Sequence, residues 1–543
     1  MKKYINIIAL IVLITSFIGC SDFLEHDAYG AGSSDNFWKN EADVTEAINA
    51  FGNTFAAREG TAGRGIMWFE NCSDNLVTGR TNSNADNAKN FKMAAGSGLD
   101  VRDTWPRMYQ LITMTNNIFR NVPGMDLTES FKNNALGQAH FYRGFAYLWI
   151  SPYYGDNDVN GGLPIMTENT PVDDLDQPRP KSVLENYDMI IEDMRKAGDL
   201  LPLFSALSKS DYGRPHKAAA WAFGARAALY AAQYDSKYYD IVLEFTDKVM
   251  KLTGDDKRNL FDDGSSNPFA KLFRKENNFS SEYLFSILGN PTEGPKFHGM
   301  SFQNGGFGLY NTWGYFQPTY ELYKAFEVGD VRREATILYP GEEITYIGKK
   351  IIWAVNPAEI SSTSGLTFRK FMSIFEAEDC IGKDVSPNGN NQSNRLGQTL
   401  IRYADVLLMR SEALIWKNGE GNAEAKMLLN QIRKRARLPE NSTASKAELK
   451  NQRRCELAFE FMPSRHLDLV RWGDAAVEYA KPLHGVKTIL KKDPQGNNLP
   501  VIDKIEVQQI WPSRSFDPKV HHVFPIPLSE VTKSKNLTQN YKY

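Results

Sequence analysis

Cysteine is scarce in this 543-residue chain, which contains only four. Cys20 belongs to an N-terminal pattern described below, so Cys72, Cys380 and Cys455 remain for the folded body. An odd number leaves at least one thiol without a disulfide partner, and no spacing among the cysteines suits a structural zinc site. The sequence therefore excludes a disulfide framework, and these thiols are expected to be small buried residues rather than reactive ones.

An excess of charge of either sign is also absent. The formal net charge is −2 with 24% charged residues, which excludes a basic field over the whole protein that would attract nucleic acid. Two local basic runs, Arg433-Lys434-Arg435 and Arg453-Arg454, have acidic residues interleaved around them. Nucleic-acid binding depends on positive charge that is free to neutralise phosphates, so no nucleic-acid partner is predicted.

Long apolar runs are limited to the N-terminus, where Tyr4–Gly19 follows Lys2 and Lys3. The run is shorter than the roughly 20 apolar residues that a membrane-spanning helix needs, and it ends directly before Cys20. This pattern is typical of a bacterial lipoprotein signal, in which the cysteine thiol is acylated. We therefore predict a lipoprotein signal peptide at residues 1–19 and lipidation of Cys20, with the acyl chains as a durable anchor. An ordinary signal peptide with a coincidental cysteine is the alternative.

Enzyme motifs are missing as well. The sequence contains no His-Glu-x-x-His, Gly-x-Ser-x-Gly or Walker pattern, and nothing singles out the carboxylate pair that a glycosidase holds roughly 5 to 10 Å apart. The histidine doublet His521-His522 would point to opposite faces of a strand, and Asp262-Asp263-Gly264 lacks the spacing of a calcium loop. We therefore predict a protein that is not an enzyme, with no catalytic residue, no cofactor and no metal site.

Helical periodicity is abundant, with apolar residues recurring every three to four positions. In the first half the pattern marks Glu41–Glu59, Trp105–Val122, Asn133–Ile150, Val183–Leu201, Lys217–Ala232 and Tyr238–Leu252. In the last third it marks residues 401–415, Ala423–Ala436, Lys446–Phe461 and Leu467–Ala480. Adjacent segments with short joins indicate helical hairpins, so the predicted fold is mainly α with a helical-hairpin core.

Two long segments between the helices, Gly60–Gly98 and Gly254–Asn394, are rich in glycine and asparagine. Loops of this length are uncommon unless function requires them. Only Thr319–Val328 is predicted as a helix in the second segment, with Ile344–Val355 and Thr367–Phe375 as short strands. We therefore expect one compact body that carries two loop-rich inserts and few short strands.

Several sequence motifs resemble those of the SusD/RagB family. They are Trp105–Asn117, Ala139–Gly144, Leu400–Ala413, Asn430–Ala436, Glu456–Glu460, Arg465–Trp472 and Phe524–Pro527. The family's closing Asn-Pro-Gly-Tyr is present here only as Asn540-Tyr541-Lys542-Tyr543. Together with Cys20, these motifs span nearly the whole chain in the family's order. The resemblance implies a tetratricopeptide-like core and a body over residues 20–543, with an N-terminal part at about 20–230 and a C-terminal part at about 260–543.

The resemblance also implies a function. Members of the family are lipoproteins on the outer face of the outer membrane, where they bind glycans and act as a lid on a SusC-like TonB-dependent transporter. We therefore expect a lipid-anchored, outward-facing protein that captures oligosaccharides and delivers them to this partner without chemistry. A related lid that binds peptide or glycoprotein is one alternative, and a surface-anchored glycoside hydrolase is another.

Two stretches have the composition of a glycan site, which needs aromatic planes beside planar polar groups. The candidate contacts in Trp68–Asn84 are Trp68, Asp74, Asn75, Arg80 and Asn82. Those in Phe302–Phe316 are Tyr310, Asn311, Trp313 and Tyr315. Because glycan contacts vary between members of the family, these residues come from composition and not from the resemblance. The alternative is that each aromatic ring fixes its own loop to the body, as we expect for Trp105 in its helix.

The motif residues themselves are predicted to be structural. Arg402, Asp405, Arg410 and Glu412 lie on a helix whose other face is apolar, and charges near a core need partners. Candidate partners on adjacent helices are Arg453, Arg454, Glu456, Glu460, Arg465 and Asp468. Phe524–Pro527 is expected to be a rigid, packed tail because proline fixes its own backbone angle, and a transporter interface is the alternative.

Overall fold

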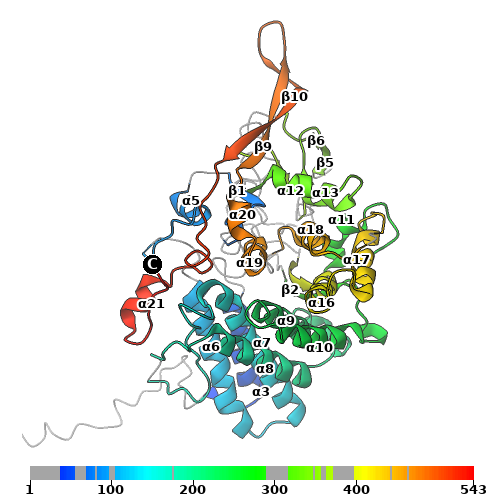
Figure 1. Ribbon diagram of the computed structural model, residues 1–543. Helices are drawn as coiled ribbons and strands as arrows, with labels where there is room; N and C mark the ends of the chain where they lie inside the picture. The colour runs from blue at the N-terminus through cyan, green and yellow to red at the C-terminus, as the bar shows by residue number, and fades with distance from the viewer. Residues whose placement is uncertain are drawn as a thin grey trace, which may run out of the picture.

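The computed structural model is mainly α-helical with several short two-stranded sheets (Figure 1), which confirms the predicted fold class. It describes residues 37–55, 69–79, 82–96, 104–173, 176–288, 316–346, 349–355, 362–370, 397–440, 443–460 and 464–543. Over these ranges no helix is both long enough and apolar enough to cross a bilayer. Cys20 and Cys380 lie outside them.

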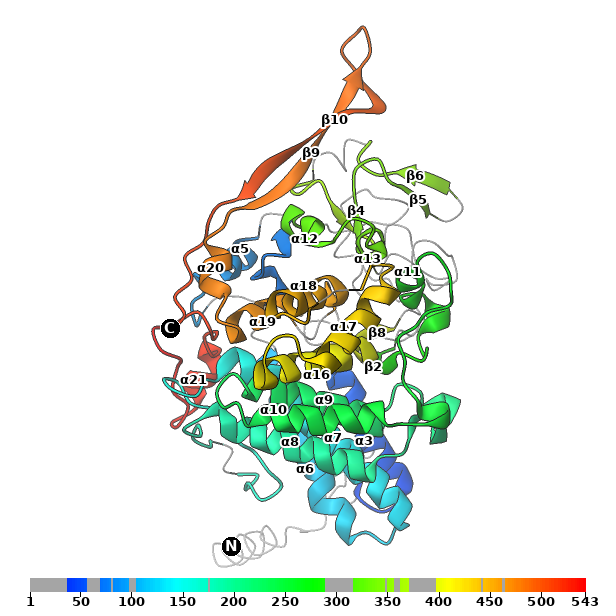
Figure 2. The same cartoon turned by 45° about the vertical axis from the view of Figure 1, so that its right-hand side comes forward.

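A stack of helices forms the lower half of the molecule (Figures 1 and 2). We call it the helical body: α3 Glu41–Phe55, α6 Thr104–Asn121, α7 Glu129–Tyr154, α8 Val183–Leu200, α9 Lys217–Ala231, α10 Tyr238–Met250, α16 Tyr403–Asn418 and α17 Ala423–Arg435. From α6 to α10 each helix packs on the next, and α10 packs on α16. The six helices predicted in the first half of the chain are confirmed, although α7 extends four residues further at each end.

Short side chains allow these helices to approach closely. Almost every residue of α9 is buried, and the alanines that dominate it leave room for its neighbours. Gly224 of α9 faces Phe245 of α10, and a Cβ atom at this glycine would lie 2.8 Å from the ring. Interiors are packed too densely to accept such an addition without a shift. The alanine run therefore serves close helix packing, as its composition suggests.

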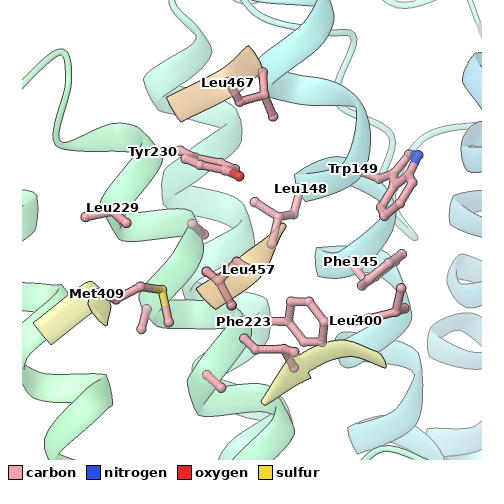
Figure 3. Packing of buried hydrophobic residues seen from close by; sticks show 14 of the residues in the cluster. Phe145, Leu148, Trp149, Phe223, Leu229, Tyr230, Leu400, Met409, Leu457 and Leu467 are labelled. Atoms are coloured by element: carbon pink, nitrogen blue, oxygen red, sulfur yellow. The ribbon is translucent and has the colours of Figure 1, made fainter. Parts of the chain in front are cut away.

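The apolar core is continuous through the helical body (Figure 3). Phe145 and Trp149 of α7 gather with Phe223 of α9, Leu400 and Met409, all of them buried. Cys72 and Cys455 are also fully buried, which confirms their expected place among the small core residues. Trp105 lies at the start of α6 with 3% of its surface exposed, and its expected packing role is confirmed.

The last third departs from the predicted helices in three places, and one is the helix predicted over Lys446–Phe461, which ends at Leu457. Residues 398–402 form strand β8 (Gln398–Arg402), paired antiparallel with β2 (Tyr283–Ile287), so the helix starts two residues later than predicted. After α18 (Lys446–Leu457), the expected single helix over Leu467–Ala480 is two short helices, α19 Arg465–Arg471 and α20 Ala475–Tyr479. Gly473 separates them with a positive φ of 76°, a conformation that glycine adopts without strain.

The two predicted inserts contain short elements rather than plain loops. We call residues 69–96, 254–288 and 316–370, where described, the loop-rich half. Its helices are α5 Ser83–Lys89, α11 Pro268–Leu272, α12 Tyr320–Ala325 and α13 Val331–Thr336. Besides β2, its strands are β1 Leu76–Thr78, β3 Phe316–Pro318, β4 Ile337–Leu338, β5 Glu343–Tyr346, β6 Lys349–Ile352 and β7 Thr367–Phe368. The strand predicted at Ile344–Val355 is therefore a hairpin of β5 and β6.

A long hairpin projects from the top of the molecule in both views (Figures 1 and 2) and was not predicted. It joins β9 (Leu483–Lys492) to β10 (Asn498–Trp511) through a turn in which the Asp493 carboxylate accepts hydrogen bonds from backbone N–H groups of Gln495 and Asn497. β9 packs closely on the body: Gly485 runs against the backbone of Ser364, where a Cβ would lie 2.6 Å from its carbonyl oxygen. β10 contacts the body through Trp511, whose Nε1 donates to Asn90 Oδ1 at 3.1 Å. The chain ends after a last short helix, α21 Leu528–Lys533.

Candidate functional site

The two stretches selected by composition meet in a pair of strands. Leu76, Val77 and Thr78 of β1 pair antiparallel with Pro318, Gln317 and Phe316 of β3. Because the strands run in opposite directions, the end of β1 lies beside the start of β3. Thr78 at the end of β1 is therefore paired with Phe316 at the start of β3. The structure brings together two segments that are more than 200 residues apart in the sequence.

Six of the candidate contact residues are not among those that the structure describes. They are Trp68, Arg80, Tyr310, Asn311, Trp313 and Tyr315. Their assignment to glycan binding stays a prediction. The described candidates are Asp74, Asn75 and Asn82, and all three have structural contacts.

Asp74 is a buried carboxylate, 3% exposed, that fixes the first stretch to helix α19 and its neighbour α18. Arg465 Nε donates to its Oδ1 at 3.0 Å, and Arg454 Nη2 lies 3.0 Å from its Oδ2. Burial by itself would raise the pKa of Asp74, but the charges of Arg454 and Arg465 outweigh it and hold the pKa well below its usual range. The aspartate is therefore a charged structural anchor at neutral pH.

Asn75 and Asn82 are also hydrogen-bonded within the protein. The Asn75 amide accepts from Arg454 Nε at 2.8 Å and donates to Glu70 Oε1 at 3.2 Å. Asn82 is the N-cap of α5, where its side-chain oxygen accepts from two backbone N–H groups of the first turn. Burial of Asp74 and Asn75 does not favour direct contact with a glycan. Their role as contacts stays a prediction, while their role in holding β1 in place is visible.

Two buried cations hold the backbone that leads into β1. Lys89 is fully buried, and its Nζ donates to the carbonyls of Asn71, Ser73 and Leu76 at 3.0, 3.3 and 2.6 Å. Arg514 Nη1 donates to the Cys72 carbonyl at 2.6 Å. Carbonyl groups in an irregular buried segment need such donors. Neither cation was singled out from the sequence, because their partners are backbone atoms that no motif records.

Aromatic rings continue the site beyond β3. Tyr320 and Tyr323 of α12 stack with ring centroids 5.7 Å apart and planes inclined by 14°, and Tyr323 stacks on Tyr339 at 4.7 Å and 27°. All three are half-buried. Lys324 lies 5.5 Å from the Tyr320 ring and Arg333 5.2 Å from that of Tyr323. Sequence analysis missed this tyrosine stack, although the spacing of Tyr320 and Tyr323 already puts both on one helix face.

A larger set of buried charges joins the loop-rich half to the helices. This ion network comprises Glu282, Asp330, Arg332 and Lys370 from the loop-rich half, and Arg402, Arg435, Glu456 and Glu460 from the last third. Arg402 is its centre, with nitrogen–oxygen distances of 2.6 Å to Glu456 and 2.7 Å to Glu460. Four positive and four negative groups balance one another. The predicted pairing of Arg402 with Glu456 and Glu460 is confirmed.

The other motif charges are paired as well. Asp405 contacts Arg226 and Arg453, the second at 2.6 Å, and Arg453 also holds Asp468 at 2.8 Å. Glu412 pairs with Arg471, which the sequence did not suggest. These contacts confirm that the motif residues are structural, and they show why the motifs occur together: each supplies charges to another.

Metal binding has no support within the described ranges, where no group of three or more His, Cys, Asp and Glu side chains is placed to hold an ion. Asp262 is paired with Arg437 at 2.7 Å and Asp263 with Lys271 at 2.6 Å. His522 Nε2 lies 2.9 Å from Asp156. These acidic groups act as ion-pair partners.

The fold and the site define a class of protein: a helical scaffold on which buried charges fix a loop-built, aromatic surface. Two family models match the chain, one described as "Starch-binding associating with outer membrane" over residues 22–229 and the SusD family over residues 276–543. The chain belongs to the SusD/RagB family. The division of the body at about residues 230–260 stays a prediction.

Known relatives and solved structures are similar to this chain over nearly its full length. SusD-like protein P2 of Formosa agariphila is 24% identical over 99% of both chains. A SusD-like protein from Bacteroides fragilis has a solved structure with a TM-score of 0.76 and 22% identity, covering 94% of this chain and 99% of that one. A solved "Laminarin binding SusD-like protein" matches with a TM-score of 0.70 and 21% identity over 93% of this chain and 100% of that one. At these identities the solved structures show that the fold is shared.

Proposed function

We propose that the protein is a cell-surface glycan-binding lipoprotein that captures oligosaccharides and delivers them to a SusC-like TonB-dependent transporter in the outer membrane. The observation that carries this proposal is the β1–β3 pair, which joins the two stretches that were selected independently for glycan-like composition. The tyrosine stack (Tyr320, Tyr323 and Tyr339) begins two residues after β3.

Glycan binding suits the chemistry of this surface. Sugars present weakly apolar C–H faces and a rim of hydroxyl groups, so aromatic planes beside hydrogen-bond donors match them. The tyrosine stack supplies rings, and Lys324 and Arg333 lie against them as donors. The starch-binding description of one family model and the laminarin-binding name of one structural neighbour support the same ligand class.

Cys20 and the outer-membrane description of the family model support attachment to the outer membrane. A lipid anchor keeps the protein beside the transporter and raises the effective concentration of the one for the other. The replacement Cys20→Ser is expected to abolish incorporation of radiolabelled palmitate and to release the protein from the membrane fraction. Labelling that persists in this variant would rule out the anchor.

A polysaccharide panel tests the ligand class. The purified protein is run in native gels that contain one polysaccharide each, and the same mixtures are assayed for new reducing ends. Retardation without new reducing ends is the expected result. New reducing ends would identify a glycoside hydrolase instead, and binding restricted to peptides would identify a peptide-binding lid.

Trp313 gives a first test of the site. The replacement Trp313→Ala is expected to weaken retardation without lowering the melting temperature. Trp416 of α16 is a matched control, because it is half-buried on the helical body and distant in sequence from both stretches. Equal retardation of the two variants would remove Trp313 from the site.

A further inference from the structure

A cavity lies on the helical body, between α6 and the C-terminal tail. Its volume is about 450 Å³, which falls in the range of small-molecule sites. Trp105, Tyr109 and Thr113 of α6 form one wall, and α21 with the residues that follow it forms the opposite wall. Figures 1 and 2 both show α21 low on the molecule, away from β1 and α12. The cavity is therefore separate from the site at β1 and β3.

The tail is fixed at both ends of this cavity. On one side, the backbone N–H of Leu528 donates to the Ala95 carbonyl at 3.1 Å. On the other side, the Asp176 carboxylate accepts from the Ser534 hydroxyl and from the Lys535 backbone N–H. These bonds hold the pKa of Asp176 below its ordinary value. Between the two fixed points, α21 has no fully buried side chain, and its Val531 is half-buried against the core. The cavity remains between α21 and α6.

The lining of the cavity is apolar at the base and polar at the rim. The Trp105 and Tyr109 rings lie 5.0 Å apart at 37°, and Pro164, Met166 and Leu537 complete the apolar base. The rim offers hydrogen-bond donors and acceptors, some neutral and some charged: Thr113, Asp176, Glu530 and Lys533. Lys533 Nζ lies 3.6 Å from Glu530, so the charges of α21 offset each other.

This lining selects against two classes of ligand. A wholly apolar ligand would remove water from the charged rim without replacing its hydrogen bonds, which is costly. A highly charged ligand would meet charges of both signs. A neutral molecule with one apolar face and many hydroxyl groups satisfies base and rim together, and a pyranose ring has this form.

We infer that the cavity between α6 and α21 is a second sugar-binding site that takes one or two neutral pyranose rings. The ligand class rests on the proposed function, whereas the cavity itself does not. A second site on the same chain would engage a polysaccharide at two points, which raises its retention beyond that of either site.

Saturation-transfer NMR with neutral disaccharides (maltose, cellobiose, laminaribiose and xylobiose) tests the inference on the full-length chain in detergent. The replacement Thr113→Trp fills the cavity from an exposed position of α6, and Gln110→Trp places the same side chain on the same helix outside it. For at least one disaccharide, Thr113→Trp is expected to weaken binding at this site by about tenfold or more, equivalent to about 1.4 kcal/mol. Gln110→Trp is expected to bind like the wild type. Lys533→Ala, which removes only a rim donor, should weaken binding less.

Failure of this inference is distinguishable from failure of the proposed function. If Thr113→Trp and Gln110→Trp bind every disaccharide equally, the cavity is not a sugar site, whatever the Tyr320→Ala/Tyr323→Ala variant does. If the wild type binds none of the disaccharides while the cavity takes the anionic, largely aromatic dye anilinonaphthalene sulfonate, the ligand class is wrong. If Thr113→Trp reduces disaccharide binding and the tyrosine replacements do not, the site between α6 and α21 is supported and the site at β1 and β3 is excluded.

Discussion

The helical body and the loop-rich half differ in the interactions that stabilise each of them. In the helical body, apolar and small side chains do most of the packing, as in α9, where alanines and Gly224 let α10 approach. Buried ion pairs such as Arg226–Asp405 are set between the helices. In the loop-rich half, buried charges make the decisive contacts: Asp74 with two arginines, Lys89 with three carbonyls, and the ion network around Arg402.

The difference follows from what each kind of backbone needs. A helix satisfies most of its own N–H and C=O groups, so its surfaces can pack mainly through apolar atoms. An irregular segment leaves carbonyls without partners, and buried cations such as Lys89 and Arg514 supply the missing donors. The irregular segments of the loop-rich half are therefore held in place by buried basic side chains, some from within it and some from the last third of the chain.

The largest effect is expected where the two halves join. Arg402→Ala leaves Glu282, Glu456 and Glu460 buried without their common cation, and stranding buried charges in this way costs about 3–5 kcal/mol. Urea unfolding should show a loss of this size in the free energy of unfolding. Arg437→Ala is the control, because the pair with Asp262 is partly exposed and contributes no more than about 1 kcal/mol. Equal losses in the two variants would show that the network does not join the halves.

Low pH should reduce the stabilisation that Asp74 gives to the loop-rich half. The pKa of Asp74 is held below its ordinary value of 3.8, so its contribution is complete above pH 4–5 and is lost as the pH falls toward the folded-state pKa. Asp74→Asn should therefore lose roughly 2–4 kcal/mol of unfolding free energy at pH 7. The gap to the wild type should narrow steadily below pH 4. A gap that is constant with pH would mean that the charge of Asp74 is irrelevant.

In the helical body, stability should depend on the close approach of neighbouring helices. Gly224→Ala puts a methyl group 2.8 Å from the Phe245 ring, and overpacking of this kind costs about 1–3 kcal/mol. Gly52→Ala in α3 is the matched control, since no atom lies within 4 Å of the added carbon, and it should be neutral or stabilising by up to about 1 kcal/mol. Thermal unfolding of both variants checks this, and a lower melting temperature for Gly52→Ala would refute it.

The smallest effect concerns ligand contact rather than stability. Tyr323→Ala removes the middle ring of the tyrosine stack, and an aromatic contact contributes about 0.5–1.5 kcal/mol. Glycan affinity should fall by roughly two- to tenfold at an unchanged fold. Titration calorimetry with the best polysaccharide of the panel measures it, and full affinity in this variant would exclude the stack from the site.

Much of this architecture could be predicted because it depends on local pattern. The apolar periodicity of Val183–Leu201 gave α8 to within one residue, with Ser182 as its cap. The charges of Arg402 and Asp405 on an apolar helix required partners, and several of those named were right. The β9–β10 hairpin could not be predicted from apolar periodicity, because β10 is exposed along most of its length and has no alternation of buried and exposed residues.

The rest depends on contacts between distant segments. Nothing local to Glu282 indicates that it pairs with Arg402, and nothing local to Lys370 indicates that it pairs with Glu460. Both partners lie in another part of the sequence. Composition pointed to two stretches for the site, but their meeting at β1 and β3 and the addition of Tyr339 to the stack are properties of the folded chain. The polar composition around Asp74 and Asn75 suggested an exposed segment, but both side chains are buried in contacts within the protein.

Native affinity electrophoresis of the Tyr320→Ala/Tyr323→Ala variant beside the wild type tests the central claim most directly. If the scaffold presents a glycan-binding surface at β1, β3 and α12, the wild type is slowed by at least one polysaccharide, the variant is slowed much less, and both melt at the same temperature. Equal retardation of the two proteins, or no retardation of either by any polysaccharide, would contradict the account.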